Sequence, residues 1–165
     1  MIGALGTVLE LAMSLLKPHP PLAFDVSAKA VICRRDRVLL LRRPNGRWDL
    51  PGGKVRSDEQ VVDGLAREVR EETGLNVAAL YRLSVIRRKR GNGENCLVIS
   101  FHCSASDAAE IELSTEHEAF GYFGFGEVSN LRLRPHHKQA IRDAFWFLYP
   151  PAHQLTCPHS QMTAA

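Results

Sequence analysis

Three glutamates, Glu68, Glu71 and Glu72, are spaced so that one face of a helix would carry all of them. Residues three and four apart are neighbours on a helix, so these carboxylates repel one another, and partial burial makes their ionisation harder still. A bound cation relieves both penalties. Mg²⁺ prefers carboxylate and backbone oxygens and leaves coordination positions for water or phosphate. The spacing therefore indicates a site for a hard divalent cation.

The helix that positions these acids is predicted over residues 58–73. Ser57 and Gln60 are spaced as an N-terminal capping box, and Gly74 suits the left-handed residue that ends a helix. Helical periodicity predicts a buried apolar stripe beside the acids, made of Val61, Val62, Leu65, Ala66 and Val69. Gly64 falls on the acidic face, where it either leaves room beside a metal or is a tolerated defect.

A charge run on a helix is most often a solvated surface with ion pairs, which is the alternative interpretation of this face. The order of the residues argues against it. Gly53 is followed after five residues by Glu59 and, after seven more, by REVREETGL at 67–75. This resembles the signature of the Nudix hydrolase family, G-x5-E-x7-R-E-U-x-E-E-x-G-U with U aliphatic, at all nine specified positions. WDLPGG at 48–53 and EHEAFGYF at 116–123 extend the resemblance over roughly residues 24–149.

The resemblance implies an α/β fold, in which a mixed central sheet lies between the helix at 58–73 and a C-terminal helix as an α/β/α sandwich. It also implies an activity, the hydrolysis of a nucleoside diphosphate linked to a second group. In that family water attacks phosphorus in the presence of Mg²⁺ or Mn²⁺. We therefore expect a small nucleoside diphosphate derivative as the partner, rather than nucleic acid.

The same resemblance assigns roles to individual residues. The metal ligands would be Glu68, Glu71, Glu72 and the carbonyl oxygen of Gly52. Arg67 would act in catalysis by pairing with Glu59 or by contacting a phosphate. Glu118, with Glu116 as the next choice, would complete the metal shell or activate water. The residues that hold loop and helix in position would be Gly53, Glu59 and Gly74.

Substrate-binding residues are expected at Arg42, Arg88 and Tyr122. Arg88 belongs to a basic, glycine-containing loop at 87–95, which is either a solvated hairpin tip or a phosphate contact. Tyr122 lies in an aromatic run that either stacks on a base or packs in the core. The positions that distinguish some subfamilies hold Arg90 and Gly91, so nucleotide sugars, ADP-ribose-like compounds and oxidised nucleotides all stay open.

Two other functions are disfavoured by the residues present. A non-catalytic domain that senses a nucleotide and regulates a partner would need no set of three acids, so the intact glutamates disfavour it. Isomerisation of an isoprenoid diphosphate on a related fold would need a catalytic cysteine. Cys96 and Cys103 lie in strand-like runs without a matching motif.

Composition is that of an ordinary globular domain, with 165 residues, 45% of them hydrophobic, and a net charge of +3. A mild positive charge permits an anionic ligand but does not by itself indicate binding to nucleic acid. The four cysteines lack C-x-x-C spacing, which favours free thiols in a reducing compartment. With no apolar run long enough to span a membrane, we expect a cytoplasmic protein.

Three segments are predicted along the chain. Residues 1–22 form an apolar helix and a proline-rich connector, residues 23–150 the hydrolase domain, and residues 151–165 a mobile tail. The N-terminal helix would dock on the domain or form a homodimer, with membrane-surface association or disorder as alternatives.

Within the domain, period-2 patterning predicts strands at 26–33, 37–41, 80–87, 96–104 and 110–113. Pro135 opens a last helix that Pro150 and Pro151 end. His136 and His137, in the first turn of this helix, are expected to face solvent.

Overall fold

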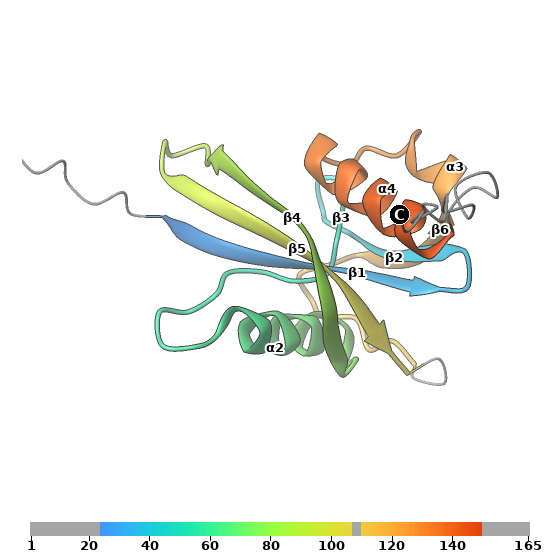
Figure 1. Ribbon diagram of the computed structural model, residues 1–165, viewed down its shortest axis with the longest axis horizontal. Coiled ribbons are helices and arrows are strands. Elements are labelled where there is room, and N and C mark those ends of the chain that lie inside the picture. Colours follow the sequence, from blue (N-terminus) through green and yellow to red (C-terminus); the bar gives the residue numbers. More distant parts are fainter. Residues whose placement is uncertain (1–23, 107–109, 150–165) are drawn as a thin grey trace, which may run out of the picture.

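The computed structural model describes residues 24–106 and 110–149, which form a mixed sheet with helices on both faces (Figure 1). In chain order the elements are β1 (Asp25–Arg34), β2 (Arg37–Arg42), β3 (Trp48–Asp49), α2 (Val61–Thr73), β4 (Val77–Lys89), β5 (Asn95–Ala105), β6 (Ala119–Gly124), α3 (Phe125–Val128) and α4 (Pro135–Leu148). The predicted N-terminal helix and C-terminal tail lie outside the described residues. Within the two described ranges, every helix is too short or too polar to span a bilayer.

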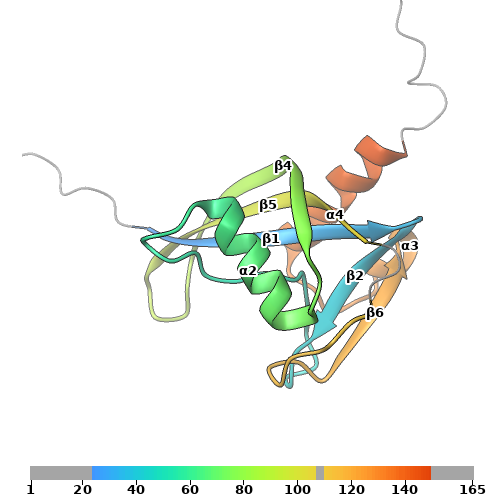
Figure 2. The ribbon, with the colours of Figure 1, turned by 90° about the horizontal axis from the view of Figure 1, so that it is seen from below.

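The strands are ordered β3-β2-β1-β5-β4, and β6 also pairs with β2. β1 and β5 run parallel, in a register from Asp25 opposite Cys96 to Ile32 opposite Cys103, whereas the other pairs are antiparallel. Figure 2 shows β2 and β6 turning away from the three strands β1, β5 and β4. The predicted α/β class with a mixed central sheet is confirmed.

Both faces of β1 and β2 are buried, because side chains alternate across each strand and a helix covers each face. The core on the α2 side includes Ala28, Ala30, Ile32, Leu39 and Leu41, packed with Leu65 and Val69. The core on the α4 side includes Val31, Val38 and Leu40, packed with Ala140, Ile141 and Ala144. α2 and α4 therefore enclose the sheet from opposite sides (Figure 1).

The loop that precedes α2 runs beside β1 like an added strand. Backbone N–H groups of Ala28 and Ala30 donate to the carbonyls of Gly53 and Pro51, each at 2.9 Å. Val55 N–H returns a bond of 2.9 Å to the carbonyl of Val26. These bonds fix the glycine turn between β1 and the start of α2.

The helix α2 begins at Val61, three residues later than predicted, and the expected capping box is wrong. Gln60 occupies the N-cap position without a side-chain capping bond. The C-terminal prediction is confirmed, since Gly74 has φ of 71° and its N–H donates to Arg70 O at 2.8 Å. Val62, predicted to be buried, is 45% exposed because it lies at the edge of the apolar stripe.

The strand predicted at 110–113 is also wrong. Instead of joining the sheet, this segment donates to the free carbonyls at the end of α2, which lack partners inside the helix. Glu112 N–H bonds to Thr73 O and Ser114 N–H to Glu72 O, both at 3.0 Å. The other predicted strands are present, although β4 and β5 extend beyond their predicted ends.

Candidate functional site

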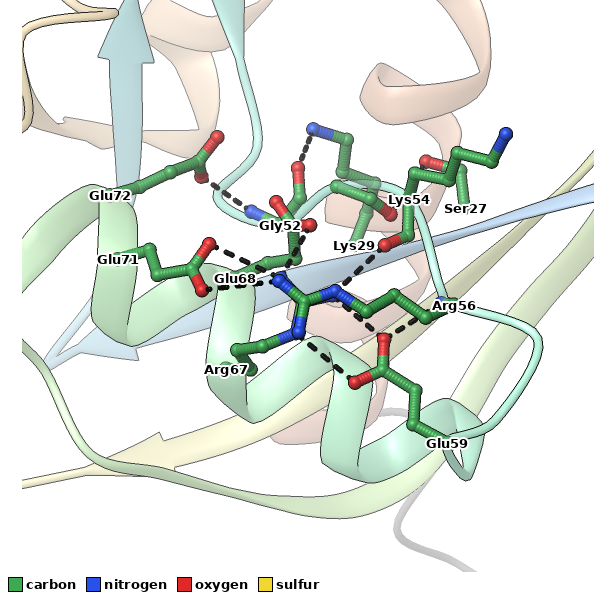
Figure 3. Close-up of polar contacts among 11 residues, drawn as sticks. Ser27, Lys29, Gly52, Lys54, Arg56, Glu59, Arg67, Glu68, Glu71 and Glu72 are labelled. Atoms are coloured by element: carbon green, nitrogen blue, oxygen red, sulfur yellow. Dashed lines mark hydrogen bonds and ion pairs between the residues drawn. The ribbon is translucent and has the colours of Figure 1, made fainter.

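Arg67 links α2 to the loop before it (Figure 3). Its Nε and Nη2 donate to the two carboxylate oxygens of Glu59 at 3.1 and 2.7 Å, and Nη2 also donates to Lys54 O at 3.1 Å. Glu59 Oε1 accepts a further bond from the Arg56 N–H at 2.8 Å. The bond from Arg67, and then that from Arg56, lower the pKa of Glu59 to about 2. A two-pronged arginine–carboxylate pair of this kind fixes geometry as well as charge.

The third nitrogen of Arg67 holds two of the predicted metal ligands. Nη1 donates to Glu68 Oε1 at 2.9 Å and to Glu71 Oε2 at 3.1 Å. The Glu71 side chain is 54% exposed, whereas that of Glu68 is 20% exposed. Arg67 thus neutralises part of the repulsion that the sequence predicts on this face.

Glu72, the third predicted ligand, is buried on the same side of α2. Its Oε2 accepts a bond from the Gly52 N–H at 2.7 Å. Burial raises the pKa of Glu72 to about 7, against the lowering effect of Lys29 and the bond from Gly52. The buried ring of His117 approaches from the loop before β6, with Nε2 3.8 Å from Glu72 Oε1.

The two glycines of the turn allow α2 to approach this closely. Gly52 has φ of 114°, and a Cβ there would lie 2.4 Å from Ala28 O, so no other residue fits without displacement. A Cβ on Gly53 would lie 2.0 Å from Glu68 Oε2. Glu68 and Glu72 therefore both press against the same two-residue turn.

Gly64 matches neither of the two interpretations that the sequence left open, room beside a metal or a tolerated defect. A Cβ on Gly64 would lie 2.7 Å from Glu59 Oε1. The glycine therefore makes room for the carboxylate that Arg67 holds, rather than for a metal ion.

Lys29 is a site residue that the sequence analysis missed. From β1 its buried ammonium donates to Leu50 O at 2.9 Å and also to Gly52 O, the carbonyl predicted to bind metal. Glu72 thus holds the amide of Gly52 while Lys29 holds its carbonyl, and Figure 3 shows them on opposite sides of the turn. The available signal was a lysine inside an apolar strand run, where a charge is rarely buried without a partner.

Asp49 is the acidic partner of Lys29, and three cationic or protonatable groups surround its carboxylate. Its carboxylate oxygens lie 3.6 Å from Lys29 Nζ, 3.2 Å from Arg43 Nε and 2.9 Å from His137 Nδ1. These neighbours hold the pKa of Asp49 far below its usual range despite its burial. His137 is 1% exposed, so the prediction that it faces solvent is wrong: it turns inward toward Asp49.

A cavity of about 340 Å³ opens beside the turn, on the face of β1 that carries Lys29. Its lining residues are Ser27, Lys29, Arg43, Asn45, Asp49, Gly52, Gly53, Lys54, Arg88, Val98, Arg134 and His137. Most of the charged groups are cationic. Arg88, predicted to contact substrate, is one of them.

The remaining predicted site residues lie elsewhere. Glu118 is half exposed and pairs with Arg42, whose Nη2 lies 3.7 Å from Glu118 Oε2. Tyr122 packs against the core on the α2 side, and the guanidinium of Arg34 lies 5.0 Å from its ring centroid. Neither Arg42 nor Tyr122 lines the basic cavity within the described ranges.

The acids of α2 suit a hard divalent cation by their chemistry. Two carboxylates, Glu68 and Glu72, face one glycine turn, and Glu71 stands beside them with an exposed side chain. In the part of the chain that the structure describes, no three acidic, histidine or cysteine side chains already surround a common point. The donor type fits such an ion, while the Gly52 carbonyl is taken by Lys29.

Comparison with known proteins gives consistent matches. The family model described as NUDIX domain matches residues 23–144. A "MutT-like protein" of Streptomyces ambofaciens is 40% identical over 112 residues, covering 67% of this chain and 70% of that protein. A "putative 8-oxo-dGTP diphosphatase" of Bacillus subtilis is 30% identical over 114 residues, covering 68% and 74% respectively. The solution structure of the E. coli ORF135 protein superposes with a TM-score of 0.68 at 25% identity, covering 81% of this chain and 98% of that one.

Proposed function

We propose that this chain, which belongs to the Nudix family of pyrophosphohydrolases, hydrolyses the diphosphate linkage of a nucleoside diphosphate derivative by attack of water on phosphorus. The observation that carries the proposal is the convergence of Glu68 and Glu72 on the Gly52–Gly53 turn, with Arg67 fixing the neighbouring carboxylates. The carboxylates concentrate negative charge at the place where an anionic diphosphate would bind. Cations bound between the carboxylates and the diphosphate would remove this repulsion.

Glu68, Glu71 and Glu72 would hold Mg²⁺ or Mn²⁺. When bound, such an ion neutralises phosphate oxygens and lowers the pKa of a coordinated water. The Gly52 carbonyl, the further ligand expected from the sequence, would become available only if the Lys29 ammonium moved away. Arg67 would keep the Glu68 and Glu71 carboxylates oriented through the hydrogen bonds that it donates to them.

Glu118 remains our first choice for the group that accepts a proton from the attacking water. It is half exposed, and its ion pair with Arg42 at 3.7 Å is loose enough for reorientation. Catalytic contacts of this kind often tighten only when substrate binds. The roles of Gly53 and Glu59 would be structural, through Glu68 and Arg67.

The decisive experiment is turnover of a panel of nucleotide sugars, ADP-ribose-like compounds and oxidised nucleoside triphosphates with Mg²⁺, with products separated by chromatography. We expect turnover of at least one compound, and its loss on chelation. Glu72→Gln should lower kcat at least ~100-fold, the size expected on removing a ligand or base. Its circular dichroism spectrum should be unchanged, because the amide oxygen of glutamine can still accept the bond from Gly52.

Glu112→Gln, an exposed acid outside the cluster, is the matched control and should keep full activity. Normal activity of Glu72→Gln would refute the assignment of the site. Tight binding of one compound without turnover of any would instead favour the alternative of a nucleotide-sensing domain.

A further inference from the structure

The basic cavity beside the glycine turn has a surplus of positive charge. Five cationic side chains line it, Lys29, Arg43, Lys54, Arg88 and Arg134, against one carboxylate, Asp49. Asp25, outside the lining, lies 3.0 Å from Lys54 Nζ and 3.2 Å from Arg90 Nη1, so these two cations share its charge. Even with both acids counted in full against the five cations, three positive charges remain in excess.

Arg88 and Arg134 account for most of that surplus. Neither forms an ion pair with an acid in the described ranges, and the Nε atom of Arg88 is buried without a hydrogen-bond partner there. Their positive charges also repel each other: burial, and then the charge of Arg88, lower the pKa of Arg134. The same charges act on His136, two residues after Arg134: burial, and then the charges of His137, Arg134 and Arg88, lower the pKa of His136 to about 4.

Two like charges directed into one cavity destabilise the folded chain unless an anion joins them. Arg88 comes from β4 and Arg134 from the N-cap of α4, so their meeting is a product of the tertiary fold. The guanidinium group presents a planar fork of donors that matches phosphate oxygens. The chemistry of the cavity wall therefore selects an anion with several oxygens.

The wall offers little surface to an apolar occupant. Among the described residues that line the cavity there is no phenylalanine, tyrosine or tryptophan, and Val98 is the one aliphatic side chain. The one aromatic ring in this lining is the imidazole of His137, which is buried against Asp49. A phosphate group would find unpaired donors instead.

We propose that this cavity is a phosphate subsite, in which Arg88 and Arg134 bind an additional phosphate that the substrate carries beyond the scissile diphosphate. The inference rests on the proposed function and narrows it to nucleoside diphosphate derivatives that bear a further phosphate. Lys29 and Arg43, both oriented by Asp49, form the boundary between this subsite and the glycine turn. The reacting diphosphate lies on the side of the turn that faces α2, and the additional phosphate on the side that faces β4 and α4.

The test compares compounds that differ by the additional phosphate alone: NADPH with NADH, and coenzyme A with its dephospho form. For at least one pair we expect a KM about tenfold to a hundredfold lower for the phosphorylated member, as a charge-assisted bidentate contact implies. Arg88→Gln and Arg134→Gln should each remove this preference, by raising the KM of the phosphorylated member toward that of the other member. Equal KM values within every pair that is turned over would overturn the proposal.

Arg87→Gln is the matched control, because Arg87 is the neighbouring residue of β4, is exposed, and does not line the cavity. It makes the same change in net charge and should keep the preference. If Arg87→Gln and Arg88→Gln lose it equally, the effect comes from overall charge and the subsite is refuted.

Binding of pyrophosphate by calorimetry, with a chelator present, separates this inference from the proposed activity. We expect Arg88→Gln to weaken binding at least about tenfold and Arg87→Gln to leave it unchanged. This result would support the subsite even if no compound in the panel is hydrolysed. Equal affinities for all three proteins would refute the subsite even if hydrolysis is observed.

Discussion

Replacement of Lys29 by methionine tests whether the buried ammonium holds the glycine turn in place. Methionine has nearly the same length and stays apolar, so the change removes the charge and the donors with little change in packing. It leaves the Leu50 and Gly52 carbonyls without their donor and leaves Asp49 buried with Arg43 and His137 as its remaining partners. We expect a folded but clearly less stable protein.

The magnitude follows from the contacts that are lost. A hydrogen bond from a charged donor contributes about 1.5–3 kcal/mol, and Lys29 makes two of them. Removing one partner of a buried ion pair costs about 3–5 kcal/mol, a range that overlaps the sum of the two bonds. We therefore expect the free energy of unfolding to fall by about 4 kcal/mol. For a domain of this size that lowers Tm by about 8–16 °C.

Urea unfolding followed by circular dichroism, with calorimetry for Tm, measures both quantities. Lys54→Met is the control, because Lys54 is 60% exposed and makes a single surface ion pair with Asp25. Its loss should cost at most about 1 kcal/mol. A loss below about 1 kcal/mol for Lys29→Met as well would refute the argument that Lys29 clamps the turn.

Three further predictions concern the loop and the acids. Gly53→Ala should lower kcat at least about tenfold by displacing the Glu68 carboxylate, whereas Gly91→Ala, with open space around it, should be silent in the same assay. The folded-state pKa of Glu59, about 2, lies below the usual 4.5, so its ionised form stabilises the fold above pH 4.5, and this contribution is lost as the pH falls toward 2. Urea unfolding across that range should therefore show a steeper loss of stability for the native chain than for Glu59→Gln; parallel curves would contradict the assignment. Glu118→Gln should lower kcat about 10²–10⁴-fold with little change in KM, and an unchanged kcat would remove Glu118 as the base.

The helix α2 was predictable because each part of the family signature that it carries gives a local physical signal. The acids, the glycines and Arg67 lie within one segment, so spacing alone predicts which side chains share a face. The two glycines before the helix were identified for the same reason. The start of the helix was misplaced because Glu59, which the sequence puts in the first turn, is held by Arg67 and by the Arg56 N–H in the loop.

The basic cavity was not predictable, because its residues come from segments far apart in the chain. Lys29 and Asp49 are joined by a salt bridge that no local pattern records. His137 sits on the first turn of a helix, where a polar residue normally faces water, and only the position of Asp49 draws it inward. Arg88 was predicted to bind substrate from the basic residues around it in the sequence. No comparable pattern marks Arg134, which lines the same cavity.

The parallel pairing of β1 with β5 has a consequence for how the chain folds. The two strands are adjacent in the sheet, yet the whole of β2, β3, α2 and β4 lies between them in the sequence. Closing so long a loop has an entropic cost that comes before this pairing adds any stability. We therefore expect folding to be slow, toward the millisecond-to-second range. On the ribosome, β1 must wait with one edge unpaired until β5 has emerged. The β2 hairpin and the loop at residues 51–55 can meanwhile occupy its other edge, which limits the opportunity for two nascent chains to associate through that strand.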